Sequence, residues 1–458
     1  MLITILAGVF ILSIVIVVHE FGHFIVAKKL GIFVKVFSIG FGRKLIKKRF
    51  GETIYAISAL PFGGYVKFAG ETESSEVKEA PRGGDADEIA DADIDPHRYF
   101  INKHPLVRSA VVFAGPFSNY VLAVLIYVAM YVGQGLRVPP QTTAIGDIDA
   151  GSPADSVGLM TKDTILEMGG KHVTNWDEII DAVWEHREDV IPLEILRGQD
   201  TLTVDFKCRI EDNRVNIGFY PYISSLIGQV KRDGPAYRTG MRSGAVVEAI
   251  NGAPIESFSD IERIVHASPN VPLVVRWSQE GVQHEDSITP VRKRVLKEGS
   301  KTEFKIVGQV GVGPSYRNER VPLPRAVVMG FESSTRMIAE ILSFLKLLVT
   351  GRTGIDAVGG PILITQMAGD MARWGFNYLI YFLAFFSINL CIFNLLPILP
   401  FDGGHLTLFF YEGATRRRLN RRLRDVLTQV GFVLLIALMI FVVVIDLTRC
   451  AGSSPALF

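Results

Sequence analysis

The sequence predicts a multi-pass α-helical membrane protein with four spans, a membrane-associated β-hairpin region and two tandem copies of a small α+β domain. Four apolar runs occur in the 458 residues, at 2–18, 106–132, 376–400 and 426–445, and each approaches the roughly 20 residues that cross a bilayer as a helix. A glycine-punctuated segment with strand signals follows the first run. A gapless internal repeat lies between the second and third runs.

The composition is consistent with membrane spans and argues against a nucleic-acid partner. Hydrophobic residues make up 48% of the chain and the formal net charge is +1, so we expect no broad basic surface. The alternative for the first run is a cleaved signal peptide, but no basic segment precedes it and no small-x-small cleavage site follows it. The three cysteines are too scattered to predict a disulfide framework.

Basic residues beside the apolar runs predict the orientation of the spans. Eight Lys and Arg residues lie between positions 28 and 49, after the first run, and six Arg residues lie between 416 and 424, before the last. By the positive-inside rule both of these loops are cytoplasmic. We therefore expect both termini and the repeated domains on the side opposite the cytoplasm.

The segment after the first run combines strand and turn signals. Apolar stretches at 39–43, 53–57 and 61–68 are interrupted by glycine and proline, which predicts a β-hairpin. The following residues, 71–95, are rich in Glu, Asp and Ala and contain almost nothing to bury. We expect them to form a solvated cytoplasmic loop.

The repeat predicts two copies of one small domain. Residues 144–160 align without a gap on residues 226–242, and the matching pairs are Ile145 and Ile227, Gly146 and Gly228, Pro153 and Pro235, Ala154 and Ala236, and Gly158 and Gly240. Further along, Gly170 and Gly252 match in the same register. Each copy reads as a strand, a Pro-Ala turn into a short helix, and a second strand.

This pattern resembles the PDZ domain of bacterial proteases, although Ala245 stands in the second copy where the first has Asp163. The resemblance implies peptide or substrate selection by strand addition. The alternative is a pair of inert spacer domains.

Residues 323–350 mix apolar clusters with the charged residues Arg325, Glu332, Arg336, Glu340 and Lys346. This mixture is typical of a helix that lies in the membrane interface. A helix that crossed the membrane here would place the ends of the first and third spans on opposite faces.

The motif His19-Glu-Phe-Gly-His23 ends the first apolar run. In a helix its two histidines lie one turn apart on the same face, where both can bind one zinc ion while Glu20 acts as general base. Ionisable residues in a span are costly and are tolerated chiefly for function. The structural alternative is that these His and Glu side chains reach the membrane surface by snorkelling, or make hydrogen bonds that only support packing.

A catalytic zinc usually has three protein ligands, so a third is needed. Asp402 is the best candidate, because prolines and glycines interrupt the third run where this aspartate occurs. The predicted orientation brings Asp402 to the same side of the membrane as His19 and His23. His405 is a rival ligand, for which we expect instead a supporting or structural role.

Taken together, the motifs resemble the site-2 protease family of intramembrane zinc metalloproteases, of the bacterial RseP type, over essentially the whole chain. The residues that carry the resemblance are His19 to His23, Gly64-Tyr-Val-Lys67, Gly115-Pro-x-x-Asn119, the tandem copies, and Asn394-x-x-Pro397-x-x-x-x-Asp402-Gly-Gly. Phe401 stands where the family usually has leucine.

The resemblance implies a zinc-dependent endopeptidase of the bacterial inner membrane that cuts single-span proteins. Its substrates would be an anti-sigma factor already trimmed by a first protease, and remnant signal peptides; the lipid bilayer is a partner and nucleic acid is not. Glu20 would be catalytic, and the implied substrate-binding residues are Asn389, Asn394, Pro397, Pro400, Tyr65, Val66, Lys67 and Phe68.

The alternative from another class is a PDZ scaffold or ion transporter in which the buried His, Glu and Asp side chains line an ion path. A transporter would be expected to repeat its spans, whereas here the external domains repeat.

These observations divide the chain into ten predicted segments. They are the first span with the metal motif (1–27), a cytoplasmic loop with the hairpin and acidic linker (28–104), the second span (105–133), two PDZ-like domains (134–222 and 223–310), an interfacial amphipathic helix region (311–375), the third span with Asp402 (376–402), a cytoplasmic basic loop (403–424), the fourth span (425–447) and an external tail (448–458).

Overall fold

The computed structural model describes residues 2–70, 93–138, 142–211, 214–296, 304–351, 359–417 and 420–452. Most of the acidic loop predicted at 71–95 and the last residues of the predicted tail, 453–458, lie outside this set. The chain divides into two compact units, one made of residues 1–133 and 322–458 and the other of residues 134–321. Each unit has its own hydrophobic clusters.

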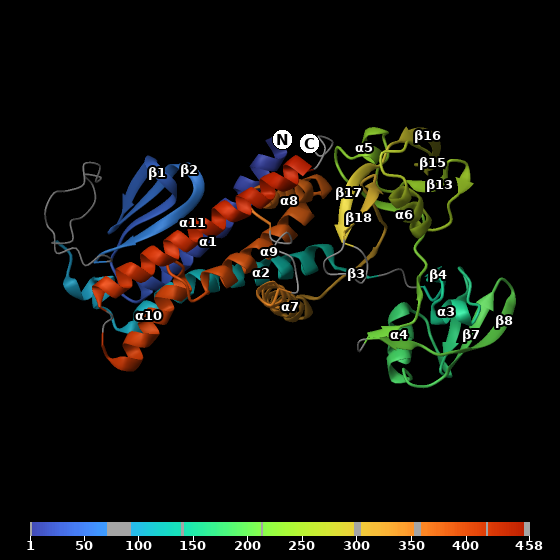
Figure 1. Cartoon of the computed structure of the whole chain (residues 1–458), viewed down its shortest axis with the longest axis horizontal. Coiled ribbons are helices and arrows are strands. Elements are labelled where there is room, and N and C mark those ends of the chain that lie inside the picture. Colours follow the sequence, from blue (N-terminus) through green and yellow to red (C-terminus); the bar gives the residue numbers. More distant parts are fainter. Residues whose placement is uncertain are drawn as a thin grey trace. The chain divides into compact units, whose positions relative to one another are not determined.

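Long helices form most of the first unit (Figure 1). They are α1 (Leu2–Lys29), α2 (Pro105–Gln134), α7 (Leu323–Val349), α8 (Pro361–Trp374), α9 (Phe376–Asn394), α10 (Asp402–Thr415) and α11 (Arg421–Gly452). Among the described residues, α1, α2, α9 and residues 422–447 of α11 are long and apolar enough to cross a membrane. The structure therefore has a helix at each of the four predicted spans.

The region 311–375, predicted as one interfacial helix region, contains two helices. The first, α7, is amphipathic and buries a narrow stripe of small residues, with Gly330 packed against Val124 and Val128 of α2. The second, α8, was not expected. It lies along the N-terminal half of α1, where Gly8 meets Thr365 and Gly369 meets Thr4, because small residues let helix backbones approach closely.

The buried carboxylate of Asp446 connects α11 to α8. It accepts hydrogen bonds at 3.1 Å from the backbone amides of Gly360, Ile362 and Leu363 at the start of α8. These amides have no partner inside their own helix, and a negative charge is favourable at a helix N-terminus. A residue of the last span thus caps the helix that packs on the first.

The predicted hairpin is folded back on itself. β1 (Val34–Phe50) and β2 (Thr53–Phe68) are each long enough to bend, and their register gives four arms in the order 44–50, 53–58, 34–39 and 64–68. The two outer pairs of arms run antiparallel, and the two middle arms run parallel. Gly40, Gly42 and Gly63 have positive φ values of 89°, 86° and 113° at the bends, a conformation that glycine adopts without strain. The arm formed by residues 64–68, called here the edge arm, ends the sheet on one side.

The turn between β1 and β2 is tied back to the end of α1. The Glu52 carboxylate accepts from Lys28 Nζ at 2.7 Å and pairs with Arg98 at 2.8 Å, beside the short 3-10 helix η2 (Pro96–Arg98). Partial burial acts to raise the pKa of Glu52, but the hydrogen bonds from Lys28 and Arg98 outweigh it and hold the pKa below its ordinary value.

The second unit contains two copies with the same topology. Each element of the second copy begins 82 positions after its counterpart, as at 145 and 227, 164 and 246, or 191 and 273. The first copy contains β4 (Ile145–Ile148), α3 (Pro153–Ser156), β5 (Thr164–Met168), β6 (Lys171–His172), α4 (Trp176–Glu185), β7 (Ile191–Arg197) and β8 (Asp200–Phe206). The second contains β12 (Ile227–Val230), α5 (Pro235–Arg238), β13 (Val246–Ile250), β14 (Ala253–Pro254), α6 (Phe258–Ala267), β15 (Leu273–Gln279) and β16 (Val282–Ile288). The sheets are ordered β6-β5-β7-β8 and β14-β13-β15-β16.

The copies differ after these sheets. The first continues through a short hairpin, β9 (Arg209–Glu211) and β10 (Arg214–Asn216), to β11 (Phe219–Pro221), which pairs with β4. The second has a longer hairpin, β17 (Val291–Leu296) and β18 (Phe304–Gln309), before β19 (Val312–Pro314) pairs with β12. The last strand of the second copy therefore lies past residue 310, where the sequence analysis ended it. Beyond it, β20 (Arg317–Glu319) pairs with β3 (Leu136–Val138).

A linked pair of differences explains why Ala245 stands where the first copy has Asp163. Buried Asp163 pairs with Arg197 at 2.7 Å and accepts from the Met160 amide at 2.8 Å. In the second copy Gln279 occupies the position of Arg197, and its side-chain oxygen accepts at 2.9 Å from the Arg242 amide, the counterpart of the Met160 amide. The same backbone donor is satisfied in both copies by different residues.

This exchange yields a prediction for the first copy. We expect Asp163→Ala to lower the free energy of unfolding of the first copy by about 2 kcal/mol. This is less than the cost of breaking a fully buried ion pair, because Arg197 is partly exposed. Adding Arg197→Gln, the residue found in the second copy, should restore most of the loss. Hydrogen exchange of the β5 and β7 amides in the full-length protein measures both changes, the first as about 30-fold faster exchange. Equally fast hydrogen exchange in Asp163→Ala and in the double variant would show that Arg197→Gln does not compensate for the loss of Asp163.

Candidate metal centre

The two histidines of the first span lie inside a continuous helix. Because α1 continues to Lys29, His19 and His23 are one turn apart and project to the same side. His19 is buried, with 6% of its surface exposed. The two Nε2 atoms are 3.2 Å apart, with the rings edge to face at 4.7 Å between centroids.

Asp402 joins the histidines from a different helix than expected. The third span was predicted to extend to residue 402, but α9 ends at Asn394 and residues 395–401 form an irregular turn containing Pro397 and Pro400. Asp402 is the first residue of α10. Its Oδ2 lies 3.1 Å from His19 Nε2 and 3.6 Å from His23 Nε2, so the turn brings the carboxylate to the histidines.

The hydrogen bonds of the histidine rings leave both Nε2 atoms available as ligands. His23 Nδ1 lies 2.8 Å from the Val111 carbonyl, which accepts its proton and leaves the Nε2 lone pair free. His19 Nδ1 lies 3.3 Å from the side-chain amide of Asn119, which is fully buried. As placed, the NH2 group of Asn119 faces Nδ1, and Asn119 Oδ1 has no hydrogen-bond partner among the described residues. Exchanging the two amide atoms, which have the same shape, would let Oδ1 accept the Nδ1 proton of His19 and satisfy both groups.

The three ligand atoms fit a zinc ion. With bonds of about 2.0–2.1 Å, tetrahedral zinc separates its ligand atoms by about 3.3 Å, close to the distances of 3.1, 3.2 and 3.6 Å seen here. Asp402 Oδ2 is buried and makes no hydrogen bond within the described residues. Three electron-pair donors that converge in this way are stabilised by a cation. The rival ligand His405 is not in this cluster, which consists of His19, His23 and Asp402.

Glycines let α1 and α2 approach closely enough to build the cluster. A Cβ added to Gly115 would collide with His23 Nε2 and lie 2.8 Å from His19 Cε1. A Cβ added to Gly22 would collide with the Ala114 carbonyl and lie 2.6 Å from Ser118 Oγ. No side chain therefore fits at either position without displacing the histidines or the facing helix.

The proposed base Glu20 lies next to the folded hairpin. A Cβ built on Gly64, the first residue of the edge arm, would be 3.4 Å from Glu20 Cγ. The predicted substrate residues Tyr65 to Phe68 form the rest of this arm. Tyr65 stacks on Phe41 and Phe68 stacks on Phe100, with centroids 6.2 and 5.2 Å apart. These rings hold the arm beside Glu20.

The two predicted asparagines have different surroundings. The Asn394 amide lies 3.4 Å from His19 Nε2, at the metal cluster. The Asn389 amide donates at 2.9 Å to the carbonyl of Phe385, one turn earlier in its own helix α9.

Four residues that contact the site, Val111, Gly115, Asn119 and Gly64, were not predicted from the sequence to be part of it. A signal was available for Asn119, a polar residue inside the second apolar run that was noted as part of a motif. No comparable signal exists for the backbone carbonyl of Val111, because any residue supplies one.

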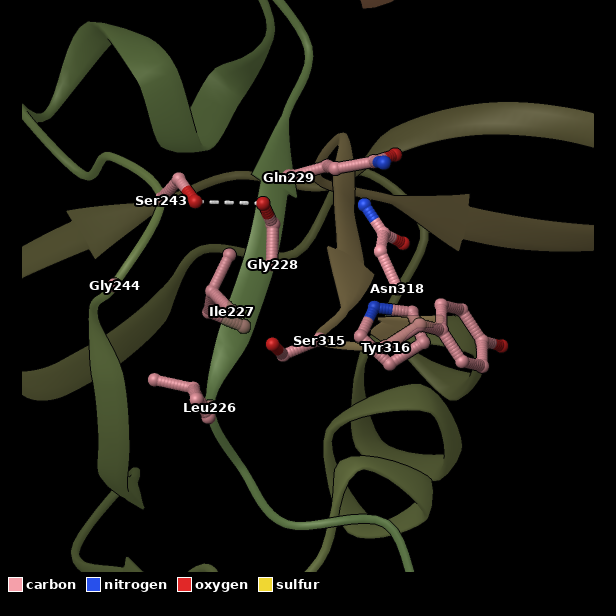
Figure 2. A pocket seen from close by; sticks show the side chains of 10 residues that line it. Leu226, Ile227, Gly228, Gln229, Ser243, Gly244, Ser315, Tyr316 and Asn318 are labelled. Carbon is pink, nitrogen blue, oxygen red and sulfur yellow. Dashed lines mark hydrogen bonds between the residues drawn. The ribbon is translucent and has the colours of Figure 1, made fainter. Parts of the chain in front are cut away.

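A separate hollow lies in the second copy of the repeat, in the other unit (Figure 2). It is formed by β12, the Ser243-Gly244 turn and residues 314–318, and the Ser243 hydroxyl donates to the Gly228 carbonyl at 2.6 Å. None of its lining residues is His, Cys, Asp or Glu. It lacks the side chains that bind metals.

Comparisons with known proteins agree with the geometry. The model of peptidase family M50 matches residues 7–438. A zinc metalloprotease described as putative, from Vibrio cholerae, is 32% identical over 97% of this chain and 98% of its own. Protease RseP of Yersinia pestis is 30% identical over 96% and 97%, and the regulator of sigma-E protease RseP of Salmonella typhimurium is 28% identical over 97% and 98%. The similarity covers nearly the whole chain.

The contact between Gly115 and the histidines predicts the result of a minimal substitution. We expect Gly115→Ala to reduce bound metal about tenfold or more, because the added methyl displaces both imidazoles from the geometry that a metal requires. Elemental analysis of the purified protein measures the loss.

Gly133→Ala is the matched control, because a Cβ at that position of the same helix meets nothing within 4 Å. Equal metal content in the two variants would show that Gly115 does not shape the site.

Proposed function

The chain belongs to peptidase family M50 and is an intramembrane zinc metalloendopeptidase, and we propose that His19, His23 and Asp402 hold its zinc while Glu20 is the general base. The observation that carries the assignment of the ligands is the convergence of two imidazole nitrogens and one otherwise unbonded carboxylate oxygen. Charged and polar groups at this depth are costly and are kept for function.

Glu20 is placed to move protons during peptide hydrolysis. Zinc, when bound, lowers the pKa of water toward neutrality and polarises the scissile carbonyl. The Glu20 carboxylate takes the proton of the attacking water and delivers it to the leaving amine. Asn394, beside His19, donates its amide to the substrate backbone and holds the scissile bond in place.

The edge arm offers a way to hold an unwound substrate. A transmembrane helix satisfies its own amides, so cutting it requires local unwinding and new hydrogen-bond partners. Within the described residues, the arm 64–68 pairs with residues 34–39 on one side. Its first residue, Gly64, is next to Glu20, and an extended substrate can add to the arm as a further strand close to that base. Val66 and Lys67 would contact the substrate, while Tyr65 and Phe68 anchor the arm.

We further propose how the enzyme sits in its membrane. The basic residues after α1 and before α11 favour a cytoplasmic location for both segments. Both termini and the second unit would then be periplasmic in a bacterial inner membrane. The relatives named as regulators of sigma-E support an anti-sigma factor as substrate, after trimming by a first protease. Remnant signal peptides, which are also short single spans, are the second proposed substrate class.

The two copies in the second unit are proposed to be tandem PDZ domains that select substrates. Their identical sheet orders and the constant offset between them support a duplicated domain. Selection works either by strand addition of a peptide or by exclusion of bulky ectodomains.

The first experiment measures zinc in detergent-purified wild type and Asp402→Ala, together with cleavage of a single-span substrate. We expect about one zinc per chain in the wild type, and weaker binding with loss of cleavage in the variant. A wild type that is free of zinc and inactive in metal-replete buffer would reject the proposed site.

The role of Glu20 predicts a separation of binding from catalysis. Glu20→Gln should keep the zinc content of the wild type, because Glu20 is not a ligand, and lose cleavage by about 100-fold or more, because an amide cannot accept the proton. Single-turnover cleavage measures the rate. Wild-type activity in this variant would remove Glu20 from the mechanism.

The structure also indicates where most of the second unit can be deleted without breaking a strand pair. Val138 and Arg317 are register partners of β3 and β20, so a short turn can replace residues 139–316 without separating those strands. If the copies act as a filter, this variant cleaves substrates that still carry their periplasmic domains. The same variant with Glu20→Gln is the control for cleavage by the metal site. Failure to cut untrimmed substrates, with trimmed ones still cut, would contradict exclusion as the mode of selection.

A further inference from the structure

One face of α2 touches both histidine ligands directly. The Val111 carbonyl accepts from His23 Nδ1, Gly115 lies under both rings, and Asn119 contacts His19 Nδ1. These three positions are spaced four residues apart, so they form a single stripe along the helix. The stripe begins one turn earlier, at Arg108, whose side chain reaches another helix.

The third ligand belongs to a stripe of its own on α10. Asp402, His405, Phe409 and Glu412 recur at intervals of three or four residues and share one face of the helix. Gly403 and Gly404 pack against the backbone at 395–399 and set the depth of the helix start. They have no side chains with which to set the rotation of the helix about its axis.

Arg108 holds the other end of this stripe. Its Nη2 donates to Glu412 Oε2 at 2.8 Å, its Nε donates to the Lys103 carbonyl at 3.1 Å, and its guanidinium carbon lies 4.6 Å from the centre of the Phe409 ring. The Arg108 side chain is 6% exposed and that of Glu412 is 16% exposed. A guanidinium held at several points in this way has a defined orientation and transmits it to its partners.

The same contacts continue to the proposed substrate strand. The Phe409 ring is 6.0 Å from Phe100, in the short 3-10 helix η3 (Phe100–Asn102), and Phe100 stacks on Phe68 of the edge arm at 5.2 Å. One partly buried cluster, made of Arg108, Glu412, Phe409, Phe100 and Phe68, therefore joins α2, α10 and the sheet. None of its members is a metal ligand.

A zinc site tolerates little movement of its ligands, so the rotation of α10 about its axis must be fixed for Asp402 to bind. A rotation of about 10° moves a carboxylate oxygen on a helix by about 1 Å, whereas ligand distances must hold within about 0.2 Å. Glu412 lies about 15 Å along the axis from Asp402, so a contact there can fix the rotation without approaching the metal.

We propose that Arg108, acting through Glu412 and Phe409, is the positioning residue that aims Asp402 at the zinc. The inference rests on the proposed ligand set. By this arrangement α2 orients all three ligands, the histidines by direct contact and the aspartate through the Arg108–Glu412 ion pair.

The test uses Arg108→Gln, Glu412→Gln, the double variant and the conservative Arg108→Lys in the full-length protein. Two quantities are measured: the rate of zinc release to a chelator, and the melting temperature with and without zinc. We expect about tenfold faster release in each single variant, no further increase in the double variant, and an intermediate rate in Arg108→Lys. The zinc-dependent gain in melting temperature should shrink in the same order.

Glu52→Gln is the matched control, because it breaks an ion pair of the same unit that involves neither α2 nor α10. It should lower the melting temperature equally with and without zinc and leave the release rate unchanged. If Arg108→Gln does not fold, Glu412→Gln and Arg108→Lys decide the question. Wild-type release rates in the folded variants would overturn the positioning role alone, whereas a wild type without zinc would reject the ligand set itself.

Discussion

The close approach of α1 and α2 is the constraint on which the site depends. Two glycines that face each other's helix, Gly22 and Gly115, bring the backbones near enough for one carbonyl and one amide of α2 to reach the imidazoles of α1. In a bilayer, where water does not drive helices together, such packing of small residues supplies much of the association. The ligand geometry is thus a product of backbone contact, and the polar groups that orient the histidines are shielded by it.

Much of the architecture could be predicted because local sequence patterns determine it. Apolar runs of span length became helices, the gapless repeat became two sheets of equal order, and the spacing of His19 and His23 placed them on one helix face. The predictions that failed concern features that depend on tertiary contacts. The third span stops at Asn394 and not at Asp402, because the turn that follows is stabilised by packing of Gly403 and Gly404 on its carbonyls. The helix α8 has a weak local signal and is held by α1 and by Asp446.

The same limit applies to the site. Residue types with rare chemistry, such as the histidines, Glu20 and Asp402, can be recognised from spacing. Groups that act through their position cannot, and these include the carbonyl of Val111, the absent side chain of Gly64 and the guanidinium of Arg108. The folded hairpin is a further case. Its strand signals were visible, but the bends that turn two strands into four arms depend on positive φ values that the sequence shows merely as glycine.

The linked difference between the two copies constrains their history. Both arrangements, Asp163 with Arg197 and Ala245 with Gln279, satisfy the same backbone amide. Passing from one to the other takes two substitutions, and the two possible intermediates are unequal. An arginine beside alanine keeps about a third of its surface in water, whereas an aspartate as buried as Asp163, at 1% exposure, would be left without its cation. Whichever copy preserves the older arrangement, the route through alanine with arginine is the less costly of the two, because solvent keeps the unpaired arginine hydrated where it could not reach the unpaired aspartate.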